Sequence, residues 1–286
     1  MGTTVTITGS GCPIPDPRRA GPGALVRTGD LTLQFDVGRS TVQRLAGAGV
    51  WIPDLTAVFV THHHSDHLVG LADLVLTHWT MDREDRGRAF PIVAPSGPSA
   101  RFAGRVLDGW EDDIDVRAAH AKRSTRPEVE LIAFDVGDTP TEVWRSGDVS
   151  VKAGPVRHEP VTPAVGYRID TPDGSVAITG DTRVCDEVAA LADGVDVLVY
   201  EAMRMEPIER LPQHRRFIME YHADTIEIGR QAAVLGVPTL VLTHLIPPPD
   251  DDAERQQFVD DVRSGGYQGD VLVADDLLTV VVGAAG

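Results

Sequence analysis

The 286-residue chain is poor in cysteine and in aromatic residues: it has two cysteines, Cys12 and Cys185, and its aromatic content is 5%. Two cysteines cannot form a disulfide framework, so we expect reduced thiols and a cytoplasmic protein. No apolar run approaches the roughly 20 residues of a membrane-spanning helix, and no basic-then-apolar segment opens the chain. We therefore expect no membrane association and no signal peptide.

Basic residues are also scarce, with 26 Lys and Arg against 43 Asp and Glu, for a net charge of −17. A protein that grips a nucleic acid through many phosphate contacts needs Lys and Arg facing the polymer. The charge balance therefore argues against a nucleic acid as partner, although a locally positive site is compatible with it. Hydrophobic residues make up 42%, as in ordinary folded proteins, and no shift in composition marks a boundary. We expect a single domain over residues 1–286.

Strand-like and helical patterns alternate along most of the chain, which predicts packed sheets covered by helices. The segment of residues 111–148 is rich in charge and is expected to form edge strands, a loop and a flap. Helices are expected at residues 41–48, 68–79 and 224–235. Strands are expected at residues 3–8, 24–27, 31–35, 55–60, 150–155, 164–169, 175–179, 195–200 and 239–243.

Four potential metal ligands follow the predicted strand 55–60 within six residues: His62, His64, Asp66 and His67. In an extended chain, His62 and His64 project to the same side. Asp66 and His67 follow where the chain turns into a helix. The segment can thus offer two imidazoles to one metal ion, and a carboxylate with an imidazole to a second. Imidazole and carboxylate without thiolate favour zinc, with manganese or iron as alternatives.

The pattern His62-x-His64-x-Asp66-His67 resembles the signature of the metallo-β-lactamase fold. That resemblance implies a four-layer αββα sandwich, in which two mixed β-sheets pack face to face with helices outside. It also implies a binuclear metal site at one edge of the sheets.

Three later residues resemble the remaining ligands of that family. His158 follows a predicted strand, and His244 lies in Leu242-Thr243-His244-Leu245. Asp181 resembles the aspartate that bridges both metals, and its Gly180-Asp181-Thr182 context is typical of the ribonuclease Z-like and arylsulfatase-like branch. The resemblance therefore implies seven metal ligands: His62, His64, Asp66, His67, His158, Asp181 and His244.

Further residues are implied around the metals. His222 resembles the non-ligand histidine with which ribonuclease Z-like enzymes protonate the leaving group. His222 and Asp66 are thus the expected catalytic residues. Asp36 resembles a structural aspartate near the first metal, and Glu201 is similarly placed; whether either one orients a ligand is left open.

The implied activity is that of a binuclear metal-dependent hydrolase, in which a metal-bridging hydroxide cleaves an ester-type substrate. Typical ribonuclease Z enzymes carry a long basic arm between the positions that match His158 and Asp181. Here those residues are 23 positions apart, which leaves room for two strands and a turn. We therefore expect a small-molecule substrate, namely a phosphodiester, sulfate ester, carboxylic ester or lactone.

Two alternatives and one further property stay open. The first alternative is a tRNA 3′-end processing endonuclease, a ribonuclease Z that lacks the usual arm. The second is a non-hydrolytic metal or redox protein of the same fold. His64 argues against the second, because the diiron oxidoreductases of the fold usually carry Glu at that position of the motif. A homodimer is left open by inheritance from the family.

Overall fold

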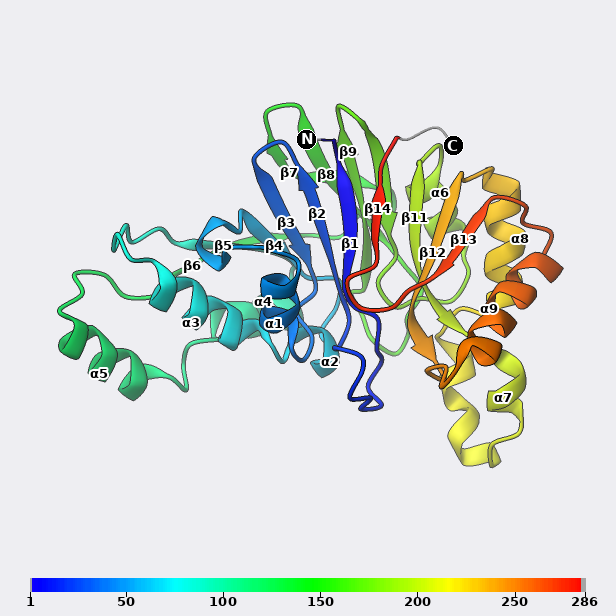
Figure 1. The fold of residues 1–286 in the computed structure, drawn as a ribbon, viewed down its shortest axis with the longest axis horizontal. Helices are drawn as coiled ribbons and strands as arrows, with labels where there is room; N and C mark the ends of the chain where they lie inside the picture. The colour runs from blue at the N-terminus through cyan, green and yellow to red at the C-terminus, as the bar shows by residue number, and fades with distance from the viewer. Residues whose placement is uncertain (1, 284–286) are drawn as a thin grey trace.

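A computed structural model describes residues 2–283 of the protein. Within this range two seven-stranded mixed sheets pack face to face, and helices cover their outer surfaces (Figure 1). The expected αββα sandwich is therefore confirmed. In spatial order the first sheet comprises β14 (Thr279–Val281), β1 (Thr4–Gly9), β2 (Gly23–Thr28), β3 (Leu31–Phe35), β4 (Ala57–Phe59), β5 (Phe90–Pro95) and β6 (Val129–Phe134).

The second sheet consists of the other seven strands. Its strands in spatial order are β13 (Asp270–Val273), β12 (Thr239–Ile246), β11 (Val197–Met203), β10 (Gly174–Ile178), β9 (Val165–Thr171), β8 (Val149–Pro155) and β7 (Thr141–Ser146). Strands β10, β11 and β12 are parallel, so their carboxyl ends meet at one edge. Such an edge is where open α/β sheets place their functional residues.

The main core lies between the two sheets, where the inward side chains of both are buried. The rings of Phe35 and Phe59 stack at 4.8 Å, and Tyr167 of β9 packs against both of them. The buried Tyr167 hydroxyl donates a hydrogen bond to the carbonyl of Val60 at 2.6 Å. This bond joins the second sheet to the first just before the chain reaches His62.

Helices pack on both outer faces through two further apolar clusters. The first sheet is covered by α1 (Thr41–Gly47), α3 (Leu71–Met81) and α4 (Pro98–Gly104), and the second by α6 (Asp186–Ala192), α8 (Thr225–Leu235) and α9 (Asp252–Ser264). The remaining helical segments are α2 (Ser65–Leu68), α5 (Glu111–Ala121), α7 (Met205–Glu209) and the 3₁₀ turns η1 (Ile52–Asp54) and η2 (Gln213–Glu220). Over residues 2–283, none of the helices has both the length and the apolar character needed to cross a bilayer.

The helix expected at residues 68–79 is interrupted near its start. Helix α2 ends at Leu68 and α3 begins at Leu71. At the break, the amide of Gly70 donates to the carbonyl of Val37 at 2.9 Å. A Cβ atom on Gly70 would lie 2.3 Å from the carbonyl oxygen of Gly38. The backbone therefore breaks here because it packs directly against the loop after β3, and only glycine permits that approach.

The segment of residues 111–148 differs in part from expectation. Its two strands, β6 and β7, are edge strands as predicted. Where a loop and flap were expected, the chain forms α5, which projects away from the sandwich (Figure 1). Only Ile114 is buried in this helix, so its sequence lacks the apolar stripe that indicates a packed helix.

Candidate metal centre

All seven predicted ligands lie at the edge where the carboxyl ends of several strands meet. His62 and His64 follow β4, Asp66 and His67 belong to α2, and the other three come from the second sheet. His158 follows β8, Asp181 follows β10, and His244 lies within β12. Both sheets thus contribute to one site, although the ligands span residues 62–244 in the sequence.

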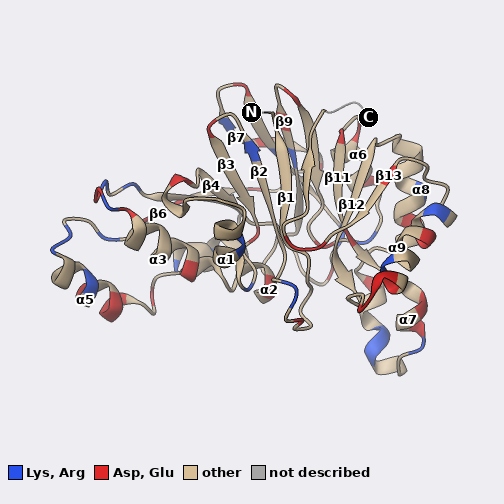
Figure 2. Ribbon diagram, in the orientation of Figure 1, with Lys and Arg blue, Asp and Glu red and all other residues tan. Residues whose placement is uncertain are grey.

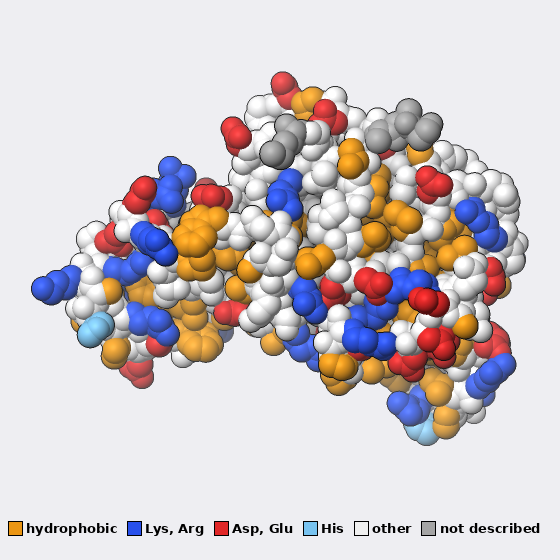
Figure 3. Space-filling view, in the orientation of Figure 1, with side chains coloured by type: hydrophobic (Ala, Val, Ile, Leu, Met, Phe, Trp, Pro, Cys, Tyr) orange, Lys and Arg blue, Asp and Glu red, His pale blue; other side chains and the backbone are white. Residues whose placement is uncertain are grey.

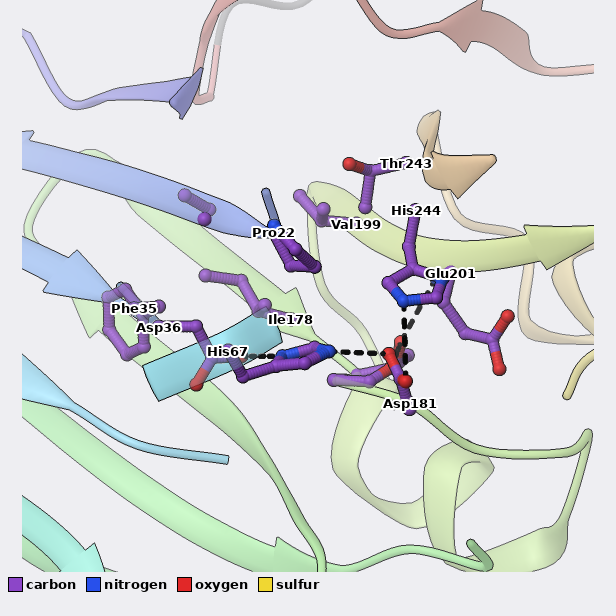
Figure 4. Close-up of a pocket in the computed structure, with 14 residues that line it drawn as sticks. Pro22, Phe35, Asp36, His67, Ile178, Asp181, Val199, Glu201, Thr243 and His244 are labelled. Atoms are coloured by element: carbon purple, nitrogen blue, oxygen red, sulfur yellow. Dashed lines mark hydrogen bonds and ion pairs between the residues drawn. The ribbon is translucent and has the colours of Figure 1, made fainter. Parts of the chain in front are cut away.

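The ligands form two groups around a shared carboxylate. The ligand atoms of His62, His64, His158 and Asp181 lie within 4.8 Å of one another, and so do those of Asp66, His67 and His244. Asp181 stands between the two groups, because its Oδ2 is 3.8 Å from His62 Nε2 of the first group and its Oδ1 is 3.3 Å from His67 Nε2 of the second. Figure 4 shows Asp181 with His67 and His244 pointing toward it.

An irregularity of β12 places His244 in this position. The pairing of β11 with β12 shifts by one residue at His244, which is the extra residue of a β-bulge. Its φ angle is +48°, in the left-handed region that non-glycine residues seldom adopt. The bulge turns the imidazole out of the regular alternation of the strand and toward Asp181.

Several buried polar atoms of the cluster have no hydrogen-bond partner among the described residues. Buried polar atoms in folded proteins are nearly always satisfied, so such a concentration is typical of residues that bind a cation. These atoms converge from both groups, and they are nitrogen and oxygen only, the donor set of divalent cations such as zinc. They are His62 Nε2, Asp66 Oδ2, His67 Nε2, Asp181 Oδ1, and both ring nitrogens of His244.

Neighbouring groups fix the orientation of three of the imidazoles. Asp36 Oδ2 accepts a hydrogen bond from His67 Nδ1 at 2.7 Å, which leaves His67 Nε2 facing the centre. Asp36 also accepts from the Thr61 amide and hydroxyl. His158 Nδ1 donates to the carbonyl of Tyr221 at 3.0 Å, and His62 Nδ1 contacts the Thr61 hydroxyl at 3.0 Å. The second ring nitrogens of His62 and His67 have no hydrogen-bond partner, and that of His158 lies 3.2 Å from His64 Nδ1, another predicted ligand atom.

Glu201 orients the ring of His222 in the same way. Its buried Oε1 accepts hydrogen bonds from His222 Nδ1 at 2.9 Å and from the amides of Thr182 and Ala223. Glu201 therefore positions His222, while Asp36 positions His67. The ligand atoms of Asp181, His222 and His244 also lie within 4.8 Å of one another, so His222 directly adjoins the two groups.

Burial controls the protonation of the first group. Burial lowers the pKa of His62 well below its ordinary value, and burial with the neighbouring His158 lowers the pKa of His64 to about 4. Burial also lowers the pKa of His158. These imidazoles are accordingly neutral near pH 7, which is the form that ligates metal ions.

Charge dominates in the second group and at His222. Burial opposes the charged form of His67, but the Asp181 and Asp36 carboxylates raise its pKa well above the ordinary value. Burial likewise lowers the pKa of His222, but the carboxylate of Glu201 outweighs it and raises that pKa to about 9. His222 can therefore carry a proton at neutral pH.

A small cavity and a larger groove adjoin the centre. The cavity, about 30 Å³, is lined by Asp36, His67, Asp181 and His244, among others, and has room for small species only (Figure 4). The groove, about 610 Å³, opens beside His222 and is lined in part by Met205 and Met219. Sequence analysis missed both methionines and Tyr221, because nothing in their local pattern distinguishes a groove wall from a core.

Comparisons with known proteins agree with this geometry. Residues 32–245 match the model of the β-lactamase superfamily domain. Over 280 residues the chain is 36% identical to a protein of Mycobacterium bovis named ribonuclease Z, covering 97% of this chain and 98% of that one. A ribonuclease Z of Mycolicibacterium gilvum is 37% identical over 285 residues, covering 97% of this chain and 96% of that one.

Solved structures share the fold at lower sequence identity. A metallo-β-lactamase-fold protein from Bacillus subtilis superposes with a TM-score of 0.71 at 21% identity, covering 98% of this chain and 99% of the other. The short form of human tRNase Z superposes with a TM-score of 0.68 at 20% identity, with the same coverage.

These comparisons contradict the expectation that argued against a nucleic acid as partner. The relatives that align along the whole chain are by name nucleases of RNA. The physical reason for the error is that a net charge of −17 sums over the entire surface. Exposed charges are screened beyond roughly 8 Å, so the total does not describe the surface beside one site.

Proposed function

Because the chain belongs to the ribonuclease Z-like branch of the β-lactamase superfamily, we propose that it is a binuclear metal-dependent endonuclease that hydrolyses an RNA phosphodiester. The substrate we propose is a precursor tRNA, cleaved at its 3′ end. The single observation that carries this proposal is the convergence of unpartnered nitrogen and oxygen atoms from both sheets on Asp181.

Two cations would be held by the seven side chains described above. His62, His64 and His158 would bind the first, and Asp66, His67 and His244 the second, with Asp181 shared between them. We propose zinc for both positions, because the donor set is imidazole and carboxylate without thiolate. When bound, two such cations supply Lewis acidity toward a phosphoryl oxygen and lower the pKa of water toward neutrality.

The chain's own residues would then complete the reaction. His222 would donate its free ring proton to the oxygen that departs when the phosphorus–oxygen bond breaks. Glu201 would hold the ring through Nδ1 and favour its protonated form before the transfer. Burial of Asp181, His158 and His244 excludes bulk water from the centre. We also place the reaction in the cytoplasm, where free thiols such as Cys12 and Cys185 stay reduced.

The decisive experiment combines metal analysis with a panel of substrates. The purified protein is expected to carry two zinc ions per chain and to cleave a precursor tRNA. Chelation is expected to abolish that cleavage, and added zinc to restore it. The panel should also contain a bis-aryl phosphodiester, an aryl sulfate and a lactone. Cleavage of one of these with precursor tRNA left intact would return the smaller ester as the substrate and contradict the proposal.

A further inference from the structure

The chain between β11 and α8 forms one wall of the groove beside the metal centre. We call residues 205–221, which comprise α7, η2 and Tyr221, the η2 segment. Met205, Met219 and Glu220 of this segment line the groove together with His222. Glu159, Glu227 and Arg183 also line it, so phosphate contacts are expected at the rim of the groove and not inside it. At the end of the segment, the Tyr221 carbonyl accepts the hydrogen bond from His158. A molecule that occupies the groove therefore lies against the η2 segment.

The middle of the η2 segment is basic and carries an exposed aromatic ring, whereas exposed glutamates, Glu206, Glu209 and Glu220, lie toward its two ends. Arg210, His214, Arg215 and Arg216 are all exposed, and 56% of Phe217 is accessible to solvent. Figure 2 shows the basic residues of this segment beside α7, and Figure 3 shows basic, histidine and hydrophobic side chains together at this end of the molecule.

Two of these arginines are not neutralised by neighbours. Arg210 pairs with Glu206, and the Arg216 Nε donates only to the Leu211 carbonyl. Over residues 2–283, neither Arg215 nor Arg216 forms an ion pair with a carboxylate. Arg215 and Arg216 are therefore two unpaired positive charges in a segment whose three arginines and three glutamates otherwise balance.

A small core anchors the η2 segment. Ile208 is buried with Cys12, Met203 and Ile246, and Met205, Ile218 and Met219 pack against them. The apolar residues that face inward are thus already covered. Phe217 is outside this cluster, so its exposure does not arise from an incomplete core. Its ring lies 6.2 Å from that of Tyr221, whose ring lies 4.8 Å from that of His222.

We infer that the η2 segment binds the single-stranded part of an RNA substrate next to the bond that is cleaved. Arg215 and Arg216 contact its phosphates, and a base stacks on Phe217. Basic side chains together with an exposed aromatic ring are the usual means of binding single strands. This inference rests on the proposed function, and it assigns a place of RNA contact to a chain that has only two strands between His158 and Asp181.

The basic residues of α5 and of the loop that follows it provide a contrast. Arg117 pairs with Asp113 at 2.8 Å, and Arg126 pairs with Asp115. Helix α5 and the η2 segment lie at opposite ends of the molecule (Figure 1). The double substitution of Arg117 in α5 and of the exposed Lys122, which directly follows that helix, therefore removes the same charge away from the groove and serves as a matched control.

The test compares Arg215→Ala/Arg216→Ala with Arg117→Ala/Lys122→Ala in the metal-loaded enzyme. The substrates are a precursor tRNA and bis(p-nitrophenyl) phosphate. The η2 variant is expected to lose about tenfold or more in kcat/KM on the tRNA, and to change less than twofold on the small phosphodiester. Its plot of log kcat/KM against log salt should become shallower by about 1.4, because each contact to a single strand contributes about 0.7. Phe217→Ala should weaken tRNA cleavage by about fivefold or more through lost stacking.

The α5 variant should behave like the wild type on both substrates. An equal loss of tRNA cleavage in both double variants would overturn the inference, since the effect would then follow total charge. Unchanged tRNA cleavage in the η2 variant would overturn it while leaving the proposed function intact. A wild-type protein that cleaves only bis(p-nitrophenyl) phosphate would overturn both.

Discussion

The two sheets contribute to the metal centre in different ways. The first sheet supplies His62, His64, Asp66 and His67 from one run of six residues, whereas the second supplies single residues in or after three separate strands. A contiguous run keeps its internal spacing wherever the local backbone forms. Residues from separate strands meet only after the sheet has assembled. One half of the site therefore depends on local structure, and the other half on tertiary structure.

The largest effect is expected where the two halves meet. Substituting Asp181 by Ala should remove both cations and reduce activity to background, because this carboxylate adjoins both ligand groups. His64→Ala should leave Asp66, His67 and His244 in place and retain one cation. The measurement is the molar ratio of metal to protein, with circular dichroism to verify folding. Normal metal content in Asp181→Ala would rule out its bridging role.

The next largest effect is expected at His222, the proposed proton donor. His222→Ala should leave both cations bound and slow turnover by roughly a hundredfold or more, because general acid catalysis is lost. Loss of a cation from this variant would instead make His222 a ligand, which its proximity to Asp181 and His244 permits geometrically. Glu201→Gln separates the role of His222 as proton donor from a role as metal ligand, since this variant weakens the positioning of the ring but leaves the ring present.

A smaller effect is expected from the support of the contiguous run. Asp36→Asn should weaken metal affinity by about tenfold to a hundredfold, because Asp36 fixes the ring of His67 and the backbone at Thr61. Titration with a competing chelator measures this change. Asp73→Asn on the exposed face of α3 is the matched control and should have wild-type affinity. Equal affinities in both variants would show that the run needs no outside support.

The smallest effect should arise at the joint between the sheets. Tyr167→Phe removes the hydrogen bond to the Val60 carbonyl and leaves that buried oxygen without its partner. The free energy of unfolding should fall by about 1–3 kcal/mol, while metal content stays the same. Urea unfolding of the chelated protein measures it, because bound metal would otherwise add its own stabilisation. A loss of metal in this variant would mean that the two halves depend on this contact for their alignment.

The contiguous run was the most predictable part of the site, because its spacing alone indicates two groups of ligands. The αββα fold, the edge position of β6 and β7, and helix α8, expected at residues 224–235 and found at Thr225–Leu235, also agreed with the sequence. His158, Asp181 and His244 could be proposed only by resemblance. Their approach to one another depends on strand order and, for His244, on a bulge that no periodicity in the sequence reveals.

Other features lay beyond sequence analysis for physical reasons. Helix α5 has almost no buried face, so no apolar stripe marks it. The break before α3 depends on the contact between Gly70 and Gly38, which lie far apart in the sequence. The argument against a nucleic acid failed because it used total charge, which does not describe the surface beside one site.

The hydrogen bond from His158 to the Tyr221 carbonyl limits how the loop before α8 can be engineered. An attempt to alter substrate choice by exchanging the loop before α8 with that of another protein must conserve the backbone position of residue 221. If that carbonyl moves, His158 loses the group that orients its ring. Grafts that end at Met219 or earlier keep the Tyr221 carbonyl in place. Met219 is therefore the safer boundary for an exchange that is meant to change substrate preference.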